Sequence, residues 1–300
     1  MIDAVVVGRV GIDLYPNELR TALRHVRTYT RYVGGFAGNV GTGLARLGVH
    51  TAIVSRVGDD GHGEFVRDFL ESEGIDTRFL AVDHDWLTPP TFCEIWPPDD
   101  FPLTFYRRPT APDWQLQPQD FDEQEVAAAP LLFATGTGLA QSPSRETTRA
   151  ALAAHKKVTV LDLDWRPSLW ADPGEYREVV QEAVGLADVA IGNTDEVAAA
   201  GGIEELLGLV PALVLKRGAD GAALYSDGET VDVPGLAVEV VNGLGAGDAF
   251  AAAVGYALVR GLGLAEGVRL GNLAGAYVAQ RVPCSEAMPH LEDLTHVEVS

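Results

Sequence analysis

The sequence predicts an α/β fold in which helices cover both faces of a mainly parallel, doubly wound sheet. Short apolar runs of strand length recur along the 300 residues, and segments with helical spacing separate most of them. Apolar residues make up 47% of the chain, which is enough for one large core. No internal repeat or low-complexity stretch interrupts this alternation.

The strands are expected where short apolar runs end at glycine or polar residues. These runs lie at 4–8, 51–57, 158–164, 189–192, 212–215 and 222–226. Apolar residues three and four positions apart predict helices between them. These helices are a Gly-rich one that ends near residue 47, and others over 63–73, 144–155, 175–186, 195–200, 203–207, 248–260 and 264–280.

Two regions, 13–33 and 88–112, break this rhythm. The second is expected to form two strands, 91–96 and 103–107, joined by a loop rich in proline and aspartate. Both regions fall between core elements, so we expect them to pair as one small sheet that projects from a single domain spanning 1–300. Two separate surface hairpins would fit the same pattern.

The composition limits the partners and the compartment. The formal net charge of −21 opposes binding to nucleic acid and to anionic membranes. The N-terminal residues lack the basic region of a signal peptide, and no apolar run reaches membrane-spanning length. Cys93 and Cys284 have no spacing typical of a zinc site or a redox pair, so two free thiols are expected. A cytoplasmic protein is therefore expected.

The strongest functional signal is Gly243-Leu244-Gly245-Ala246-Gly247-Asp248, followed at once by a long apolar helix. Glycines allow backbone N–H groups to approach a ligand closely, and a helix N-terminus supplies free N–H groups and a positive dipole end. The combination favours a phosphate. Asp248 could take a proton from an attacking hydroxyl, or it could only cap the helix.

This stretch resembles the signature of the ribokinase-like (PfkB) carbohydrate kinases, in which Gly-Ala-Gly-Asp forms the anion hole. The resemblance implies that Gly245, Ala246 and Gly247 bind the transferred phosphoryl group and that Asp248 is the catalytic base. The earlier string Gly34-Gly35-Phe36-Ala37-Gly38-Asn39 resembles the sugar-binding segment of the family, which assigns Gly34, Gly35 and Asn39 to the sugar. The match covers essentially the whole chain. It implies a ribokinase-like sheet, ATP and Mg²⁺ as cofactors, and a β-sheet lid that is often shared in a homodimer.

Further positions match the family at the ends of predicted strands. Asp13 matches the aspartate that binds sugar hydroxyls, and a carboxylate suits this role because it accepts charge-assisted hydrogen bonds. Lys216, Gly218 and Gly221 match the turn at the ATP side, although they would also make an ordinary hairpin turn. Asn272 matches a position that often borders the adenine.

Asn193 and Glu196 resemble the Asn-x-x-Glu motif, in which the glutamate helps to organise Mg²⁺ through water. Without the resemblance, the same residues read as a helix N-cap and a first-turn acid. One departure concerns Asn242, which stands where many members have an aspartate that helps to hold a monovalent cation. This departure puts activation by K⁺ in doubt, although backbone carbonyls could still hold the cation.

Local strings at 13–16, 101–107 and 162–170 are similar to those of family members that phosphorylate a sugar acid. The acids are 5-dehydro-2-deoxygluconate, from myo-inositol catabolism, and 2-keto-3-deoxygluconate; phosphate goes to the primary hydroxyl. The resemblance implies that Arg107 from the lid or Arg166 after a core strand faces the substrate carboxylate. Arg166 could instead form a structural ion pair with Asp162 or Asp164.

Other functions remain open at this point. A kinase of the same fold could act on a neutral ketohexose, ribose or a nucleoside, and a non-catalytic sugar-binding protein could share the fold. The presence of Asp248 argues against the last of these. The chain lacks the Gly-rich fingerprint of dinucleotide-binding enzymes after its first strand, and it lacks the P-loop motif.

Overall fold

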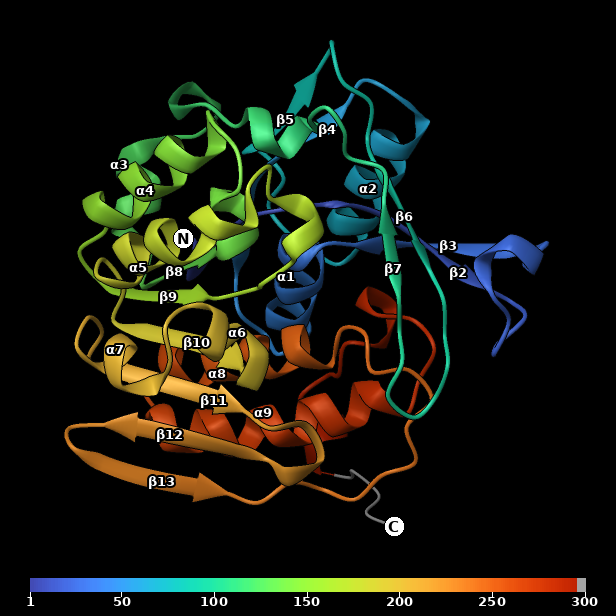
Figure 1. Cartoon of the computed structure of the whole chain (residues 1–300). Coiled ribbons are helices and arrows are strands. Elements are labelled where there is room, and N and C mark those ends of the chain that lie inside the picture. The colour runs from blue at the N-terminus through green and yellow to red at the C-terminus, as the bar shows by residue number, and fades with distance from the viewer. Residues whose placement is uncertain (296–300) are drawn as a thin grey trace.

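A computed structural model describes residues 1–295 of the chain. The strands of its main sheet are β1 (Ala4–Val7), β4 (Thr51–Gly58), β5 (Leu80–Asp83), β8 (Leu131–Thr135), β9 (Val158–Asp162), β10 (Val189–Asn193), β11 (Ala212–Lys216), β12 (Ala222–Ser226) and β13 (Glu229–Val233). Their order is β13-β12-β11-β10-β9-β8-β1-β4-β5 (Figure 1). Neighbours from β11 to β5 are parallel, and β12 and β13 are antiparallel at one edge.

Helices cover both faces of this sheet, as predicted. Ala4 and Val6 of β1 belong to one hydrophobic core cluster. The helices that contribute to it are α1 (Phe36–Arg46), α2 (Gly61–Ser72), α8 (Ala246–Val259) and α9 (Leu264–Ala279). Val5 and Val7 of β1 belong to the second core cluster, on the opposite face of the sheet. The helices that contribute to this cluster are α3 (Glu123–Ala128), α4 (Ser144–Ala154), α5 (Tyr176–Val184), α6 (Thr194–Ala199) and α7 (Ile203–Leu207). Successive strand side chains point to opposite faces, so a strand that is apolar throughout serves both clusters.

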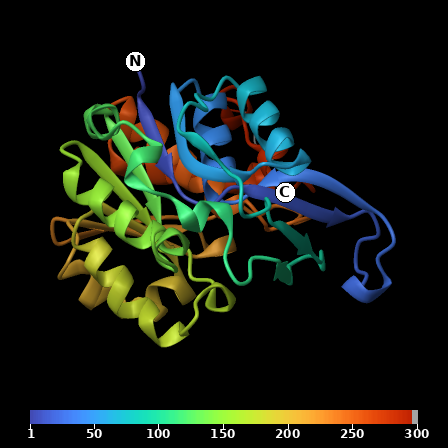
Figure 2. The same cartoon turned by 90° about the horizontal axis from the view of Figure 1, so that it is seen from above.

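The two irregular regions form one four-stranded sheet. Its strands are β2 (Gly11–Pro16), β3 (Tyr29–Gly34), β6 (Pro90–Cys93) and β7 (Leu103–Phe105), in the order β3-β2-β6-β7. Parallel pairing of β2 with β6 joins the regions, so one sheet, rather than two separate hairpins, is the correct alternative. The sheet projects from the main body (Figure 2). We refer to it as the lid.

The strand order reverses beside β1, which pairs with β4 on one side and β8 on the other. Ligands of open α/β sheets bind at the carboxyl ends of the strands at such a point. Arg9 follows β1, Thr137 follows β8 and Asp164 follows β9, so the topology brings these polar residues together. None of the helices in the described residues is long and apolar enough to cross a membrane.

Candidate active site

A small pocket lies between the lid and the carboxyl ends of β1 and β9. It encloses about 60 Å³ and is lined by Asp13, Asn39, Asp248, Arg9, Arg166 and Asp164, with Leu103 and Phe105 from the lid. The structure therefore brings together six of the predicted site residues from distant parts of the sequence: Asp13, Gly35, Asn39, Arg166, Gly245 and Asp248. The pocket is therefore narrow between these side chains.

Asp13 and Gly34 depend on each other. They lie on the paired strands β2 and β3, and a Cβ atom at position 34 would lie 2.2 Å from the Asp13 carboxyl carbon. Only glycine leaves room for this carboxylate. Burial raises the pKa of Asp13 to about 7, with a further contribution from the negative charge of Asp248 and against the attraction of Arg9. Gly35, the next residue, has φ +85° and is the N-cap of α1.

Asp248 lies in the first turn of α8 and does not cap it, because the N-cap is Gly245. Its Oδ2 accepts a hydrogen bond of 2.7 Å from Asn39 Nδ2. Burial raises the pKa of Asp248 above its usual range, although this hydrogen bond opposes the shift. The sequence assigned Asn39 to the sugar, and the structure shows that its amide holds the carboxylate of Asp248.

The turn before α8 has the features of an anion site. Gly245 has φ +81°, and a Cβ atom there would lie 2.9 Å from the side chain of Cys284, so this position requires glycine. The first N–H groups of a helix have no partner within it, and α8 is long enough to carry a dipole. Gly245 and Gly247 thus present backbone donors beside the Asp248 carboxylate, whereas the N–H of Ala246 donates to the Gly243 carbonyl at 3.4 Å.

A network centred on Asp164 holds two arginines in the pocket. Asp164 Oδ2 accepts hydrogen bonds from Arg9 Nη2 at 3.2 Å and from Thr137 at 2.6 Å, and its Oδ1 accepts one from Arg166 Nε at 3.0 Å. Burial alone would raise the pKa of the Asp164 carboxyl, but the two guanidinium groups hold it below its usual range. The ion-pair alternative for Arg166 is therefore present. The Nη groups of Arg166 have no hydrogen-bond partner among the described residues.

Arg107 is placed elsewhere. It is buried, forms an ion pair with Asp113 and stacks 4.5 Å from the ring of Trp114. It lines a neighbouring cavity under the lid, not the pocket that holds Asp13 and Asp248. The arginine beside Arg166 in that pocket is Arg9, which the sequence analysis missed. Its signal is a charged residue directly after an apolar strand, in a chain with few basic residues.

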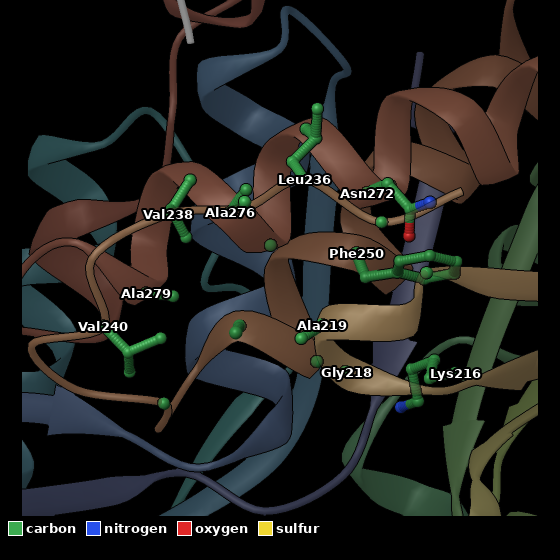
Figure 3. Close-up of a pocket in the computed structure, with 18 of the residues that line it drawn as sticks. Lys216, Gly218, Ala219, Leu236, Val238, Val240, Phe250, Asn272, Ala276 and Ala279 are labelled. Atoms are coloured by element: carbon green, nitrogen blue, oxygen red, sulfur yellow. The ribbon is translucent and has the colours of Figure 1, made fainter. Parts of the chain in front are cut away.

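A larger cavity of about 660 Å³ adjoins the anion site on the other side of the turn (Figure 3). Its walls are mostly apolar, from the segment after β13 and from α8 and α9, and its volume is that of a typical ligand pocket. Lys216, Gly218, Gly221 and Asn272 all line it, as expected of residues at a nucleotide. Asn272 donates to the carbonyls of Val233 and Pro234, which fixes the orientation of its amide.

Comparison with known proteins decides the family. Residues 1–291 match the family described as pfkB family carbohydrate kinase. The chain belongs to the pfkB family. The 5-dehydro-2-deoxygluconokinases of Shouchella clausii and Geobacillus kaustophilus are 33% and 34% identical to it, over 97% and 98% of this chain and 94% and 92% of theirs.

Solved structures of sugar kinases have the same fold. Fructokinase from Vibrio cholerae, with fructose, ADP and calcium bound, matches with a TM-score of 0.87 and 28% identity over 99% of both chains. An uncharacterized sugar kinase from Pyrococcus horikoshii, in complex with ATP, matches with a TM-score of 0.83 and 27% identity over 98% of this chain and all of that one. The protein is an ATP-dependent carbohydrate kinase with the ribokinase-like fold.

Several carboxylates surround Lys216, which lines the larger cavity. Lys216 Nζ lies 3.1 Å from Asp162 Oδ2 and 3.9 Å from Glu196 Oε2, and Asp248 lies nearby. Burial raises the pKa of Asp162 to about 7, against the attraction of Lys216. Asn193 and Glu196 also form the capping box of α6, so their structural alternative is present as well. One lysine facing these carboxylates leaves room for the charge of a divalent cation.

The described residues contain no group of three side chains arranged to bind a metal directly. Asn242 fits a monovalent cation poorly, because it is neutral and fully buried. Its amide donates to the Val282 carbonyl at 2.7 Å, and its Oδ1 accepts from the N–H of Leu244 at 3.1 Å. Both polar ends of the side chain are therefore engaged by the protein.

Proposed function

We propose that this kinase phosphorylates the primary hydroxyl of a sugar acid and that its substrate is 5-dehydro-2-deoxygluconate. The observation that carries the proposal is the pair Arg9 and Arg166, held by one carboxylate in the pocket that contains Asp248. Arg9, Arg166 and Asp164 together have one net positive charge, and the carboxyl groups of Asp13 and Asp248 line the same pocket. In a protein with a net charge of −21, an anionic substrate requires such local cations at the point where its carboxylate binds. The names of two full-length relatives support the same acid.

In the proposed reaction, the primary hydroxyl attacks the γ-phosphorus of ATP. A bond forms between the hydroxyl oxygen and phosphorus, the bond to the β–γ bridging oxygen breaks, and ADP leaves. Asp248 accepts the hydroxyl proton, and Asn39 fixes the Asp248 carboxylate by binding one of its oxygens. The N–H groups of Gly245 to Asp248 stabilise the transferred phosphoryl group, because they point at it before the reaction begins.

The remaining polar residues have binding roles in this proposal. Asp13 accepts hydrogen bonds from sugar hydroxyls, and the Nη groups of Arg166 and Arg9 bind the carboxylate. Lys216 binds the phosphates of ATP, Gly218 and Gly221 border the nucleotide, and Asn272 borders the base. When bound, Mg²⁺ would neutralise phosphate charge. Glu196, with Asn193, would hold its waters.

A phosphorylation panel tests the proposal. The enzyme is incubated with ATP, Mg²⁺ and one of 5-dehydro-2-deoxygluconate, 2-keto-3-deoxygluconate, fructose, ribose or a nucleoside, and release of ADP is followed. We expect the highest kcat/KM with 5-dehydro-2-deoxygluconate and none with Asp248→Asn at the same enzyme concentration. Preference for fructose, ribose or a nucleoside would overturn the sugar-acid assignment.

We also propose that the lid forms a homodimer. Tyr29 of β3, Phe92 of β6 and Tyr106, which follows β7, pack edge to face in a row. Tyr106 is 59% exposed, and Tyr29 and Phe92 are half-buried. Partly exposed aromatic side chains on a sheet are typical of protein interfaces. Sedimentation equilibrium should give a dimer, and Tyr106→Asp should give a monomer. A wild-type monomer at micromolar concentration would overturn this proposal.

A further inference from the structure

The loop of the lid hairpin extends far beyond the sugar pocket. β6 and β7 are joined by residues 94–102, which we call the hairpin tip. Two ladder hydrogen bonds, Trp96 N–H to Asp100 O at 2.9 Å and Asp100 N–H to Trp96 O at 3.1 Å, close the tip into a second short hairpin. A third, from Glu94 N–H to Pro102 O at 2.9 Å, continues the pairing. The tip is therefore a defined structure and not a loose connection.

This one hairpin touches both ligand sites. Leu103 and Phe105 of β7 line the small sugar pocket, whereas Pro98 and Asp99 of the tip line the nucleotide cavity. The hairpin thus runs from one cavity to the other across the anion-hole turn. In Figure 1, the connection between β6 and β7 runs from the lid down to the segment that precedes α8.

Phe101 makes the contact between the tip and the anion-hole turn. A Cβ atom at Gly243 would lie 2.8 Å from the ring of Phe101, so the ring occupies the space that any other residue at 243 would need. Gly243 has no left-handed conformation to explain its identity, since its φ is not in that range. The close approach of Phe101 accounts for the glycine.

The contact belongs to a larger apolar cluster. Tyr15, Cys93 and Ile95 of the lid pack with Cys284, and Phe101, Leu244 and Val282 surround them. Leu244 belongs to the anion-hole turn, and Cys284 packs against Gly245, the N-cap of α8. Side chains of the lid and of the turn therefore share one core. Because packed cores have discrete arrangements, a lid that moves for the sugar also changes the support of the turn.

We propose that the hairpin tip is part of the nucleotide site and that Phe101 is the positioning residue through which sugar and ATP favour each other's binding. The proposal depends on the proposed function in one respect, which is that a sugar occupies the small pocket beside Asp248. The contact of the tip with the nucleotide does not depend on which sugar this is. Coupling of this kind is reciprocal, so each ligand must raise the affinity for the other by the same factor.

The first test needs no sugar. Amide hydrogen exchange of Trp96, Asp99 and Asp100 is measured with and without the Mg²⁺ complex of a non-hydrolysable ATP analogue. We expect exchange at these three amides to slow by about five-fold or more, which is the smallest factor usual between coupled sites. Exchange at residues 17–28, the other lid loop, should stay unchanged. Unchanged exchange in the tip when the analogue is bound would overturn the proposal, whatever the sugar substrate is.

The second test measures coupling by calorimetry. In wild type, 5-dehydro-2-deoxygluconate should lower the Kd of the analogue by about five-fold or more. Phe101→Ala should bring this ratio close to one, whatever its effect on the Kd of the analogue measured without the sugar acid. Phe121→Ala, a half-buried phenylalanine packed against the main core, is the matched control and should keep the wild-type ratio.

A double-mutant cycle separates the contact from general damage. Gly243→Ala should displace the ring of Phe101 and lower the coupling ratio, and adding Phe101→Ala should lower it no further. Full coupling in Phe101→Ala, or equal loss in Phe121→Ala, would contradict the role of Phe101. If the sugar acid alone does not bind to wild type, the proposed substrate is wrong, and the exchange result still decides the role of the tip.

Discussion

Replacing Arg166 by alanine should raise KM for the sugar acid by about 10- to 150-fold. The side chain of Arg166 is 41% exposed and uses only Nε on Asp164, so its two Nη groups remain for the substrate carboxylate. A hydrogen bond between charged groups contributes about 1.5–3 kcal/mol, and about 1.4 kcal/mol corresponds to ten-fold in affinity. Arg9 keeps Asp164 paired in this variant, so the fold of the pocket should survive.

The matched control is Arg108→Ala. Arg108 is exposed on the lid and does not line the pocket, so its removal deletes the same charge without the contact. Two unit charges about 10 Å apart in water interact by about 0.4 kcal/mol, which is about two-fold. The size of the effect thus separates a direct contact from a long-range one.

Steady-state release of ADP gives KM for the sugar acid, for ATP and for a neutral analogue in which the carboxylate is reduced to an alcohol. Arg166→Ala should change KM for ATP little and should harm the neutral analogue little beyond its poor activity with wild type. An increase no larger than that of Arg108→Ala, or equal harm to acid and analogue, would make Arg166 structural. The sugar-acid assignment would then lose its main physical support.

Three other predictions follow from the same site. Asp248→Asn should lower kcat by roughly 10²–10⁴ while the Kd of an ATP analogue stays near wild type; a kcat close to wild type would leave Asp248 no part in proton transfer. The reaction needs Asp248 and Asp13 in their deprotonated forms, and burial raises the pKa of both carboxyl groups, that of Asp13 to about 7. The value of kcat/KM should therefore fall as the pH drops below about 7, and a profile that is flat down to pH 5 would contradict these pKa shifts. Because the protein engages both polar ends of Asn242, replacing K⁺ by tetramethylammonium should change kcat by less than about two-fold, whereas a ten-fold loss would reveal a monovalent-cation site.

Much of the fold could be predicted because the central strands are apolar on both faces. Continuous apolar runs such as 4–8 and 212–215 predict buried parallel strands. β13 gave no such signal, since most of its residues are exposed on an edge strand that needs no apolar face. The sequence did not predict β8, although it is buried throughout. A five-residue apolar run beside a helical segment cannot be told from part of a buried helix by its spacing alone.

The candidate site also contains residues that the sequence identifies and residues that it does not. Asp13, Asn39 and Asp248 carry local motifs, so their neighbours in sequence identify them. Arg9 has no motif and becomes a candidate only when the sheet places the end of β1 beside the end of β9. Arg107 was expected to face the substrate, but Asp113 lies close enough to bind it first. Pairings between residues distant in sequence are set by topology, which composition and spacing do not contain.

A crystal structure of the enzyme with Mg²⁺, a non-hydrolysable ATP analogue and 5-dehydro-2-deoxygluconate would show how the substrate lies against Asp248 and the two arginines. The primary hydroxyl should lie within about 2.6–3.2 Å of the Asp248 carboxylate, with the γ-phosphate over the N–H groups of Gly245 to Asp248. The substrate carboxylate should lie against Arg9 and Arg166. A sugar acid bound with its carboxylate toward solvent, or with its primary hydroxyl turned away from Asp248, would contradict the account.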